Sequence, residues 1–204
     1  MLWSPSKPAR ARQSAPSGFV VPCQPTLSAR APRAAGWIHE IKHDGWRLLA
    51  RKDGGRVRLW SRNMTDYTHH FERIAEAVAE LPEDVLLDGE AVAFHPDGHS
   101  NFEALRGRGA HDAVLVAFDI LEVEGCDLRE EPLERRRSVL DGLLSDASDG
   151  IMLSQWIEGA GPTIFEAARG LGLEGIISKR LGTKYQSGRC ANWLKTKNEK
   201  FVRR

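Results

Sequence analysis

The segment from Glu40 to Arg47, EIKHDGWR, places two groups that could do chemistry on one side of a short strand. Side chains alternate along a strand, so Glu40 and Lys42 share a face, and Asp44-Gly45 then turns the chain. A lysine at a strand end can line a cleft and act as a nucleophile once it loses its proton. A hairpin carrying a solvated lysine explains the segment equally well, so this motif needs support from others.

Two carboxylates, Asp88 and Glu90, share one face of a second apolar segment, Val85 to Phe94. Acids on a half-buried strand need a cation or a hydroxyl as partner, because burial removes their hydration. The alternative is an edge strand that shows its acids to water, and taken alone this is the more common arrangement.

The last third of the chain adds another carboxylate and two paired bases. Glu174 begins the apolar segment EGIISKR, and Lys195 and Lys197 share one face of the segment WLKTK. Like charges on one strand face repel, so these lysines either face water or share an anion such as a phosphate. A lysine, carboxylates on other strands and paired lysines are together what an enzyme moving a nucleotide through a lysine intermediate requires.

The elements that must position these residues are mostly short strands. Strands are predicted at residues 37–42, 46–52, 56–61, 85–94, 113–123, 151–156, 175–180 and 192–197. Helices are predicted at residues 68–81, within 133–144 and at 163–171, with a short one at 100–105. Strands outnumber helices and do not alternate with them, which favours an α+β class with antiparallel sheets flanked by helices over a doubly wound parallel sheet.

Residues 1–35 are predicted to form an extended Pro/Arg-rich arm rather than a packed element, and residues 36–204 to form the folded domain. The arm carries six prolines and five basic residues but no acid, and its apolar patch Phe19 to Val21 is the part expected to dock on the core. The net charge of +1 leaves a polyanionic partner open, but both ends of the chain are basic and could touch phosphates.

The cysteine pattern and the hydropathy predict a soluble protein of a reducing compartment. Cys23, Cys126 and Cys190 are too far apart in the sequence to suggest a metal pair or a disulfide framework. No apolar run approaches the roughly 20 residues that span a bilayer, so no membrane partner is expected. The predicted location is cytoplasmic.

Five segments occur in the order of the motifs of a known superfamily. They are Lys42 to Arg47, Asp88 to Glu90, Phe118-Asp119, Glu174 to Ile177 and Lys195 to Lys197. They resemble motifs I, III, IIIa, IV and V of the covalent nucleotidyltransferases, which comprise ATP-dependent DNA ligases, RNA ligases and mRNA capping enzymes. Each motif alone is weak, but their joint occurrence in this order is specific.

Three further segments resemble the ligase module of bacterial end-joining DNA ligases: Phe19 to Leu27, Ser61 to Asn63 and Ser187 to Arg189. The resemblance implies the covalent nucleotidyltransferase (ATP-grasp-like DNA ligase adenylation) fold. It also implies a function: formation of lysyl-AMP, and transfer of AMP to a 5′-phosphate at a break in double-stranded DNA. A bacterial, nucleoid-associated location follows from the same resemblance.

The same resemblance implies roles for individual residues. Lys42 is the nucleophile that becomes bound to AMP, and Glu174 holds the divalent metal, Mg²⁺ or Mn²⁺. Lys195 and Lys197 contact the α-phosphate of ATP, and Glu90 binds the ribose hydroxyls. The remaining ATP contacts are expected from Glu40 to the adenine amino group, from Phe118 and Ile177 to the two faces of the base, and from Arg47 and Arg62 to the nucleotide or a DNA phosphate.

Two alternatives remain open at this stage. The lysine chemistry is shared with RNA ligases and capping guanylyltransferases, although Glu40 and the Ser61 to Asn63 segment favour DNA ligase. The OB-fold domain that follows motif V in the family, with its basic motif VI, is expected to be absent, because only seven residues follow Lys197. A nucleotide- or DNA-end-binding module without turnover, or an enzyme completed by a separate OB-fold domain or end-joining partner protein, would fit that expectation.

Overall fold

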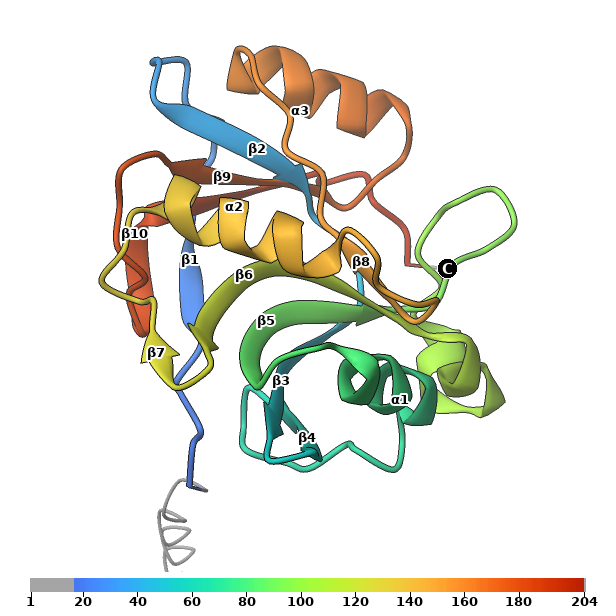
Figure 1. The fold of residues 1–204 in the computed structure, drawn as a ribbon. Coiled ribbons are helices and arrows are strands. Elements are labelled where there is room, and N and C mark those ends of the chain that lie inside the picture. The colour runs from blue at the N-terminus through green and yellow to red at the C-terminus, as the bar shows by residue number, and fades with distance from the viewer. Residues whose placement is uncertain (1–16, 204) are drawn as a thin grey trace, which may run out of the picture.

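The computed structural model describes residues 17–203, whose strands form two sheets (Figure 1). The first sheet has the order β1 (Cys23–Leu27), β10 (Gly188–Lys197), β9 (Gly175–Arg180), β2 (Trp37–Ile41). The second has the order β4 (Arg56–Ser61), β3 (Trp46–Asp53), β5 (Val85–Val92), β6 (Val114–Val123), β7 (Cys126–Asp127), and β8 (Ile151–Leu153) pairs with β6. Most neighbouring strands are antiparallel, so the predicted α+β class with antiparallel sheets is confirmed.

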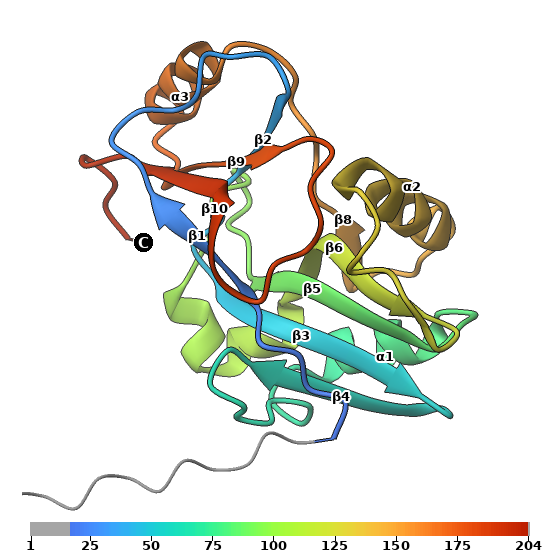
Figure 2. The same cartoon turned by 90° about the vertical axis from the view of Figure 1, so that its left-hand side faces the viewer.

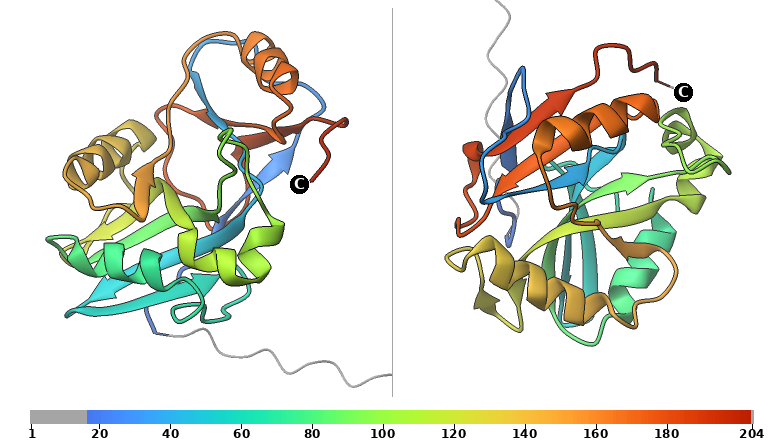
Figure 3. Two further views of the ribbon diagram at one scale, coloured as in Figure 1. Left: turned by 90° about the vertical axis from the view of Figure 1, so that its right-hand side faces the viewer. Right: turned by 90° about the horizontal axis from the view of Figure 1, so that it is seen from above.

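Three helices cover the outer sides of the sheets. α1 (Glu72–Glu80) packs on β3 and β4, α2 (Leu133–Leu144) packs on β6 and β8, and α3 (Gly161–Gly170) lies over β2 and β9 (Figure 3). Two short 3-10 helices, Glu103–Arg106 and Arg108–Asp112, join β5 to β6. Within residues 17–203, no helix is both long enough and apolar enough to cross a membrane.

The main core lies between α1 and the second sheet. α1 buries Ile74, Ala77 and Val78, whose three- and four-residue spacing puts them on one side of the helix. They join a cluster in which Leu48 of β3 and Leu87 of β5 are also fully buried. This core holds β3, β5 and β6 in place; β3 carries Arg47, and β5 and β6 carry the motif carboxylates.

The predicted arm is the main correction to the expected organisation. Residues 23–27 were expected in an extended arm, but they form β1, which pairs in parallel with β10, and Cys23 is buried. In Figure 2 the chain leads from beside β3 and β4 to β1, and on the way Phe19 packs against Trp60. Phe19 and Val20 therefore dock on the core as expected, whereas Val21 remains exposed. The first part of the predicted arm, residues 1–16, lies outside the described residues.

Smaller differences concern the ends of elements. α1 begins at Glu72 rather than at residue 68, because the backbone at residues 67–71 is occupied by a turn that closes on the carbonyl of Tyr67. The short helix predicted at 100–105 is the 3-10 helix Glu103–Arg106, with a second 3-10 helix just after it, and β8 ends at Leu153 rather than at residue 156. β7 was not predicted, because two residues are too few to give a periodic pattern.

Candidate active site

Lys42 follows β2 directly, in a turn that backbone contacts fix on both sides. The amide of Lys42 donates to the carbonyl of Gly175 on β9 at 3.0 Å. On the other side Gly45 lies so close to β5 that a Cβ there would be 2.3 Å from the carbonyl oxygen of Ala91. Only glycine allows this approach, which explains the Asp-Gly pair in the motif. The nucleophile candidate therefore sits at the junction of the two sheets.

Glu174 joins Lys42 to a second lysine. Its Oε2 accepts from the Lys42 ammonium at 2.5 Å, and its Oε1 lies 3.1 Å from the Lys197 ammonium. The carboxylate is buried, with 8% of the residue exposed, so its two cations compensate the cost of its burial. The predicted metal ligand thus lies between the nucleophile and one of the two predicted phosphate contacts.

Lys195 completes a group of cations at this end of the site. Burial is the main cause that lowers the pKa of Lys195, and the charges of Lys197, Lys42 and Arg62 lower it further. Only Glu174 among the neighbours acts in the opposite direction. Cations gathered around a single carboxylate leave an excess of positive charge, which an anion such as a phosphate would balance.

Strand register explains why distant motifs meet. Ile177 on β9 lies directly opposite Glu40 on β2 and opposite Lys195 on β10, so the three side chains form one row across the first sheet. On the second sheet, Arg47 of β3 is likewise opposite Glu90 of β5. Each row turns toward the space between the sheets.

The end of the site away from Lys42 is apolar apart from one buried ion pair. Lys179 has only 1% of its surface exposed and donates to Glu40 Oε1 at 2.8 Å and to the carbonyl of Phe118 at 3.0 Å. Its ammonium lies 4.6 Å from the centre of the Phe118 ring and 4.2 Å from that of Trp193, so two aromatic faces add to its stabilisation. The Trp156 indole also donates to Glu40 Oε1, at 3.1 Å.

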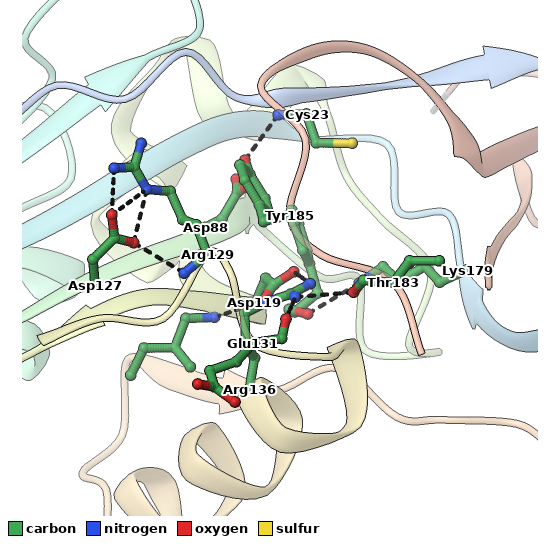
Figure 4. A network of polar contacts seen from close by, with 12 residues as sticks. Cys23, Asp88, Asp119, Asp127, Arg129, Glu131, Arg136, Lys179, Thr183 and Tyr185 are labelled. Atoms are coloured by element: carbon green, nitrogen blue, oxygen red, sulfur yellow. Dashed lines mark hydrogen bonds and ion pairs between the residues drawn. The ribbon is translucent and has the colours of Figure 1, made fainter. Parts of the chain in front are cut away.

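Arg47 is bound firmly to the second sheet. It donates to both oxygens of Asp88, at 2.5 and 2.7 Å, and its guanidinium lies 4.4 Å from the centre of the Phe118 ring. Burial acts to lower the pKa of Arg47, but the Asp88 carboxylate outweighs it and raises that pKa. Tyr185 donates to Asp88 as well and accepts from the amide of Cys23, as Figure 4 shows. This network ties β1 to the second sheet.

Glu90 differs from its neighbour Asp88, because within residues 17–203 no hydrogen bond or ion pair joins a positive charge to it. Burial raises the pKa of Glu90 to about 7, against the opposing charges of Arg47 and Lys42. A carboxyl that titrates near neutrality can accept hydrogen bonds from hydroxyls and can also donate one when protonated. Such a group suits a sugar better than a phosphate.

Asp119, the acid of the Phe118-Asp119 segment on β6, has a structural partner instead. Its two oxygens accept from Arg136 of α2 at 2.7 and 2.9 Å, and neither side chain has any exposed surface. Arg136 also donates to the carbonyls of Glu131 and Thr183 (Figure 4). This pair fixes α2 to β6 and leaves Phe118, one residue earlier on β6, directed at the site.

The two sheets enclose a cleft of about 560 Å³ at this place. The predicted site residues that line it are Glu40, Lys42, Arg47, Arg62, Glu90, Phe118, Ile177 and Lys195. Glu174 and Lys197 do not line it and lie beside Lys42 through the contacts given above. The structure thus brings all ten predicted residues together, while their individual roles stay predictions.

Sequence reasoning missed several residues of the site. Lys179 and Trp193 line the cleft, and Trp156 contacts Glu40 beside it, yet only their apolar or basic type was visible in the sequence. Lys179 had one available signal, since it lies on the same strand face as Ile177, two residues earlier. Trp156 had none, because it follows β8 in a segment without regular structure.

The described residues offer few ligands for a metal ion. Among residues 17–203, no group of three or more His, Cys, Asp or Glu side chains is placed to hold one. Mg²⁺ commonly binds one or two carboxylates and completes its shell with phosphate oxygens and water. Glu174 is a single carboxylate beside lysines whose charges could bind a phosphate, which fits that mode of binding.

The fold and the site define a nucleotidyltransferase domain of the DNA ligase type. A lysine lies between two sheets, cations lie at one end of the cleft, and an aromatic pocket with an ion pair lies at the other. Solved structures have the same fold. The ligase domain of LigD from Mycobacterium tuberculosis matches with a TM-score of 0.78 and 35% identity, over 87% of this chain and 59% of that one. Mycobacterial DNA ligase D complexed with ATP and MES matches with a TM-score of 0.76 and 35% identity, over 87% and 60%.

The chain belongs to the ATP-dependent DNA ligase domain family, whose model matches residues 24–197. Among curated proteins, the multifunctional non-homologous end joining protein LigD of Pseudomonas aeruginosa is 37% identical over 186 residues. That alignment covers 88% of this chain but only 22% of the relative, so this chain corresponds to about a fifth of that protein. The family assignment confirms the predicted resemblance and also includes most of β1, which the arm prediction left out of the folded domain.

Proposed function

We propose that this chain is the adenylation domain of an ATP-dependent DNA ligase that acts at DNA breaks. Lys42 attacks the α-phosphorus of ATP, and AMP then passes from the lysine to a 5′-phosphate at a break, where a 3′-hydroxyl displaces it. The observation that carries this proposal is the contact of Lys42 with Glu174 and, through it, with Lys197, at one end of a nucleotide-sized cleft.

The first step makes one bond and breaks one. The Nζ–P bond of lysyl-AMP forms, the bond from the α-phosphorus to the pyrophosphate oxygen breaks, and the lysine loses a proton. Lys195 and Lys197 stabilise the charge on the phosphoryl oxygens, because their ammonium groups are held near Lys42 before ATP arrives. The positions of Arg62 and Arg47 on the cleft wall support contacts with the nucleotide or with a DNA phosphate.

The other end of the cleft would hold the nucleoside. Glu40 Oε1 already accepts from Lys179 and Trp156, which leaves Oε2 to accept from the adenine amino group. Phe118 and Ile177 line the cleft from opposite sheets and would enclose the base. Glu90, with a pKa raised to about 7 mainly by burial, is the proposed partner of the ribose hydroxyls.

Glu174 is the proposed ligand of a divalent metal, Mg²⁺ or Mn²⁺, together with phosphate oxygens. The metal would supply neutralisation of the charge that develops on the phosphates. For this, Glu174 must exchange at least one of its lysine partners, and Lys42 is the partner whose release serves the reaction.

Double-stranded DNA with a nick or break is the proposed substrate, and a bacterial, cytoplasmic location near the nucleoid is proposed with it. The names of the curated relatives, which are end-joining and ligase proteins, support this substrate. A separate OB-fold domain or an end-joining partner protein is proposed to assist sealing.

The test is covalent labelling with α-labelled ATP and Mg²⁺, followed by denaturing electrophoresis. Wild type should retain label, and Lys42→Ala should lose it completely, because Lys42 is the residue proposed to form the bond to the α-phosphorus. Lys184→Ala is the matched control, since that lysine is exposed and paired with Glu130. Labelled GTP separates the capping alternative. Absence of label from wild type, even with a ligase OB-fold domain added, would contradict the proposal.

A further inference from the structure

The segment that follows β10 returns to the nucleophile turn and binds it. Arg203 donates through Nε to Asp44 Oδ2 at 2.6 Å and through Nη2 to Asp44 Oδ1 at 2.6 Å. Asp44 lies two residues after Lys42 and has only 5% of its surface exposed. A planar guanidinium that bonds both carboxylate oxygens fixes direction as well as distance, which a single ammonium does not do.

Arg203 is itself held in place. Its guanidinium lies 3.8 Å from the centre of the Phe102 ring, which comes from the connection between β5 and β6. The arginine is half exposed, yet the carboxylate it binds is buried, so this pair differs from a surface ion pair that salt and solvent weaken. Ring stacking and a bidentate bond together give Arg203 one preferred position.

The same segment also supports the partner of the nucleophile. The amide of Asn198 donates to the carbonyl of Glu174 at 2.8 Å, and its side chain donates to the carbonyl of Leu173 at 3.0 Å. Phe201 lines a small cavity together with Lys42 and Asp44. Residues 198–203 therefore contact the chain on both sides of the Lys42–Glu174 pair.

Asp44 depends on Arg203 for its hydrogen bonds. Within residues 17–203, every side-chain hydrogen bond recorded for Asp44 comes from Arg203. A buried carboxylate without a partner is costly, so removal of Arg203 would drive Asp44 toward water. Because only two residues, His43 and Asp44, separate Lys42 from Gly45, this movement would displace the nucleophile.

We propose that Arg203 is a positioning residue for Lys42, which holds the Asp44 carboxylate and thereby keeps the nucleophile turn in the geometry needed for self-adenylation. The inference rests on the proposed function for its kinetic consequence, but not for the contact itself. Arg203 would not contact ATP, so its loss should slow the chemical step and leave nucleotide binding nearly unchanged.

The kinetic test compares the full chain as wild type, Arg203→Ala, Arg203→Lys and the control Arg169→Ala, an exposed arginine paired with Glu166 on α3. Formation of lysyl-AMP is followed by rapid quench over a range of ATP concentrations with Mg²⁺. Arg203→Ala should reduce the maximal rate about tenfold or more and change the half-saturating ATP concentration by less than about twofold. Arg203→Lys should recover part of the rate, and the control should equal wild type.

A second measurement does not need turnover. Hydrogen exchange without ATP should be faster for the amides of residues 42–46 in Arg203→Ala than in wild type, and unchanged in the core of α1. A wild-type maximal rate, an effect confined to the half-saturating ATP concentration, or unchanged exchange at residues 42–46 would overturn the inference. If wild type takes no label, the proposed function fails, and the exchange result alone decides whether Arg203 holds the turn.

Discussion

The two sheets that form the walls of the cleft differ in how their charged side chains are paired. On the first sheet and beside it, Lys42, Lys195 and Lys197 gather around one carboxylate, Glu174, so positive charge is left over. On the second sheet, Asp88 is matched by Arg47 through two bonds. The first wall is prepared for an anionic ligand, whereas the Asp88 carboxylate of the second is neutralised by Arg47 within the protein.

The carboxylates of the motifs also differ in their partners. Asp88 and Asp119 are fully buried and serve arginines, while Glu90, on the same strand as Asp88, faces the cleft without a bonded cation. Acids of the same motif set therefore divide into those that hold the wall together and one that is available to a ligand.

The largest effect is expected from the fully buried pair of the second wall. Arg136→Met leaves the Asp119 carboxylate buried without its cation and should lower the free energy of unfolding by about 3–5 kcal/mol. Urea unfolding followed by circular dichroism measures it. Arg169→Met, which removes an exposed arginine, should change the same quantity by less than about 0.5 kcal/mol. A loss below about 1 kcal/mol in Arg136→Met would show that the pair does not hold the wall.

The next effect concerns the cation-rich wall. Lys195→Met removes one of the charges proposed to contact the α-phosphate, and lysyl-AMP formation at low ATP should fall about 10- to 100-fold, the usual value of a hydrogen bond to a charged group. The free energy of unfolding should not fall, because the substitution removes the repulsion between Lys195 and the charges of Lys197 and Lys42. Lys200→Met, an exposed lysine just beyond the same strand, is the control. Equal rates in both variants would refute a special role for this wall.

The smallest effect is a pH dependence at Glu90. The pKa of this group is raised by burial from 4.5 to about 7 in the folded state. Its contribution to stability is therefore fully present below about pH 4.5 and is lost as the pH rises through about 7. Glu90→Gln imitates the protonated form, so its melting temperature should equal that of wild type below about pH 4.5, exceed it by a growing margin as the pH rises to about 7, and exceed it by a constant margin above that.

The measurement is a series of melting curves for both proteins between pH 5 and 8.5. A constant difference between wild type and Glu90→Gln across that range would mean that Glu90 titrates at an ordinary pKa. In that case the contrast between the half-buried Glu90 and the neutralised Asp88 would be weaker than proposed.

Much of the site could be predicted from the sequence, because its chemistry resides in short local segments. Strand alternation alone places Glu40 and Lys42 on one face, and it does the same for Lys195 and Lys197. The family's motif order supplied the rest of the residue set, and the class of fold followed from the number and spacing of strands. Local geometry suffices when the residues concerned are neighbours along one strand.

Tertiary structure alone decided what each of these residues contacts. Asp88 and Glu90 have the same spacing signal, yet the guanidinium of Arg47 bonds to Asp88, although Arg47 lies opposite Glu90 in the strand register. β1 has an ordinary proline-rich composition, and its place in the first sheet depends on pairing with β10, more than 160 residues away. Arg203 reaches Asp44 across a similar separation. Contacts between distant segments depend on packing and strand register, which no local pattern of residue types contains.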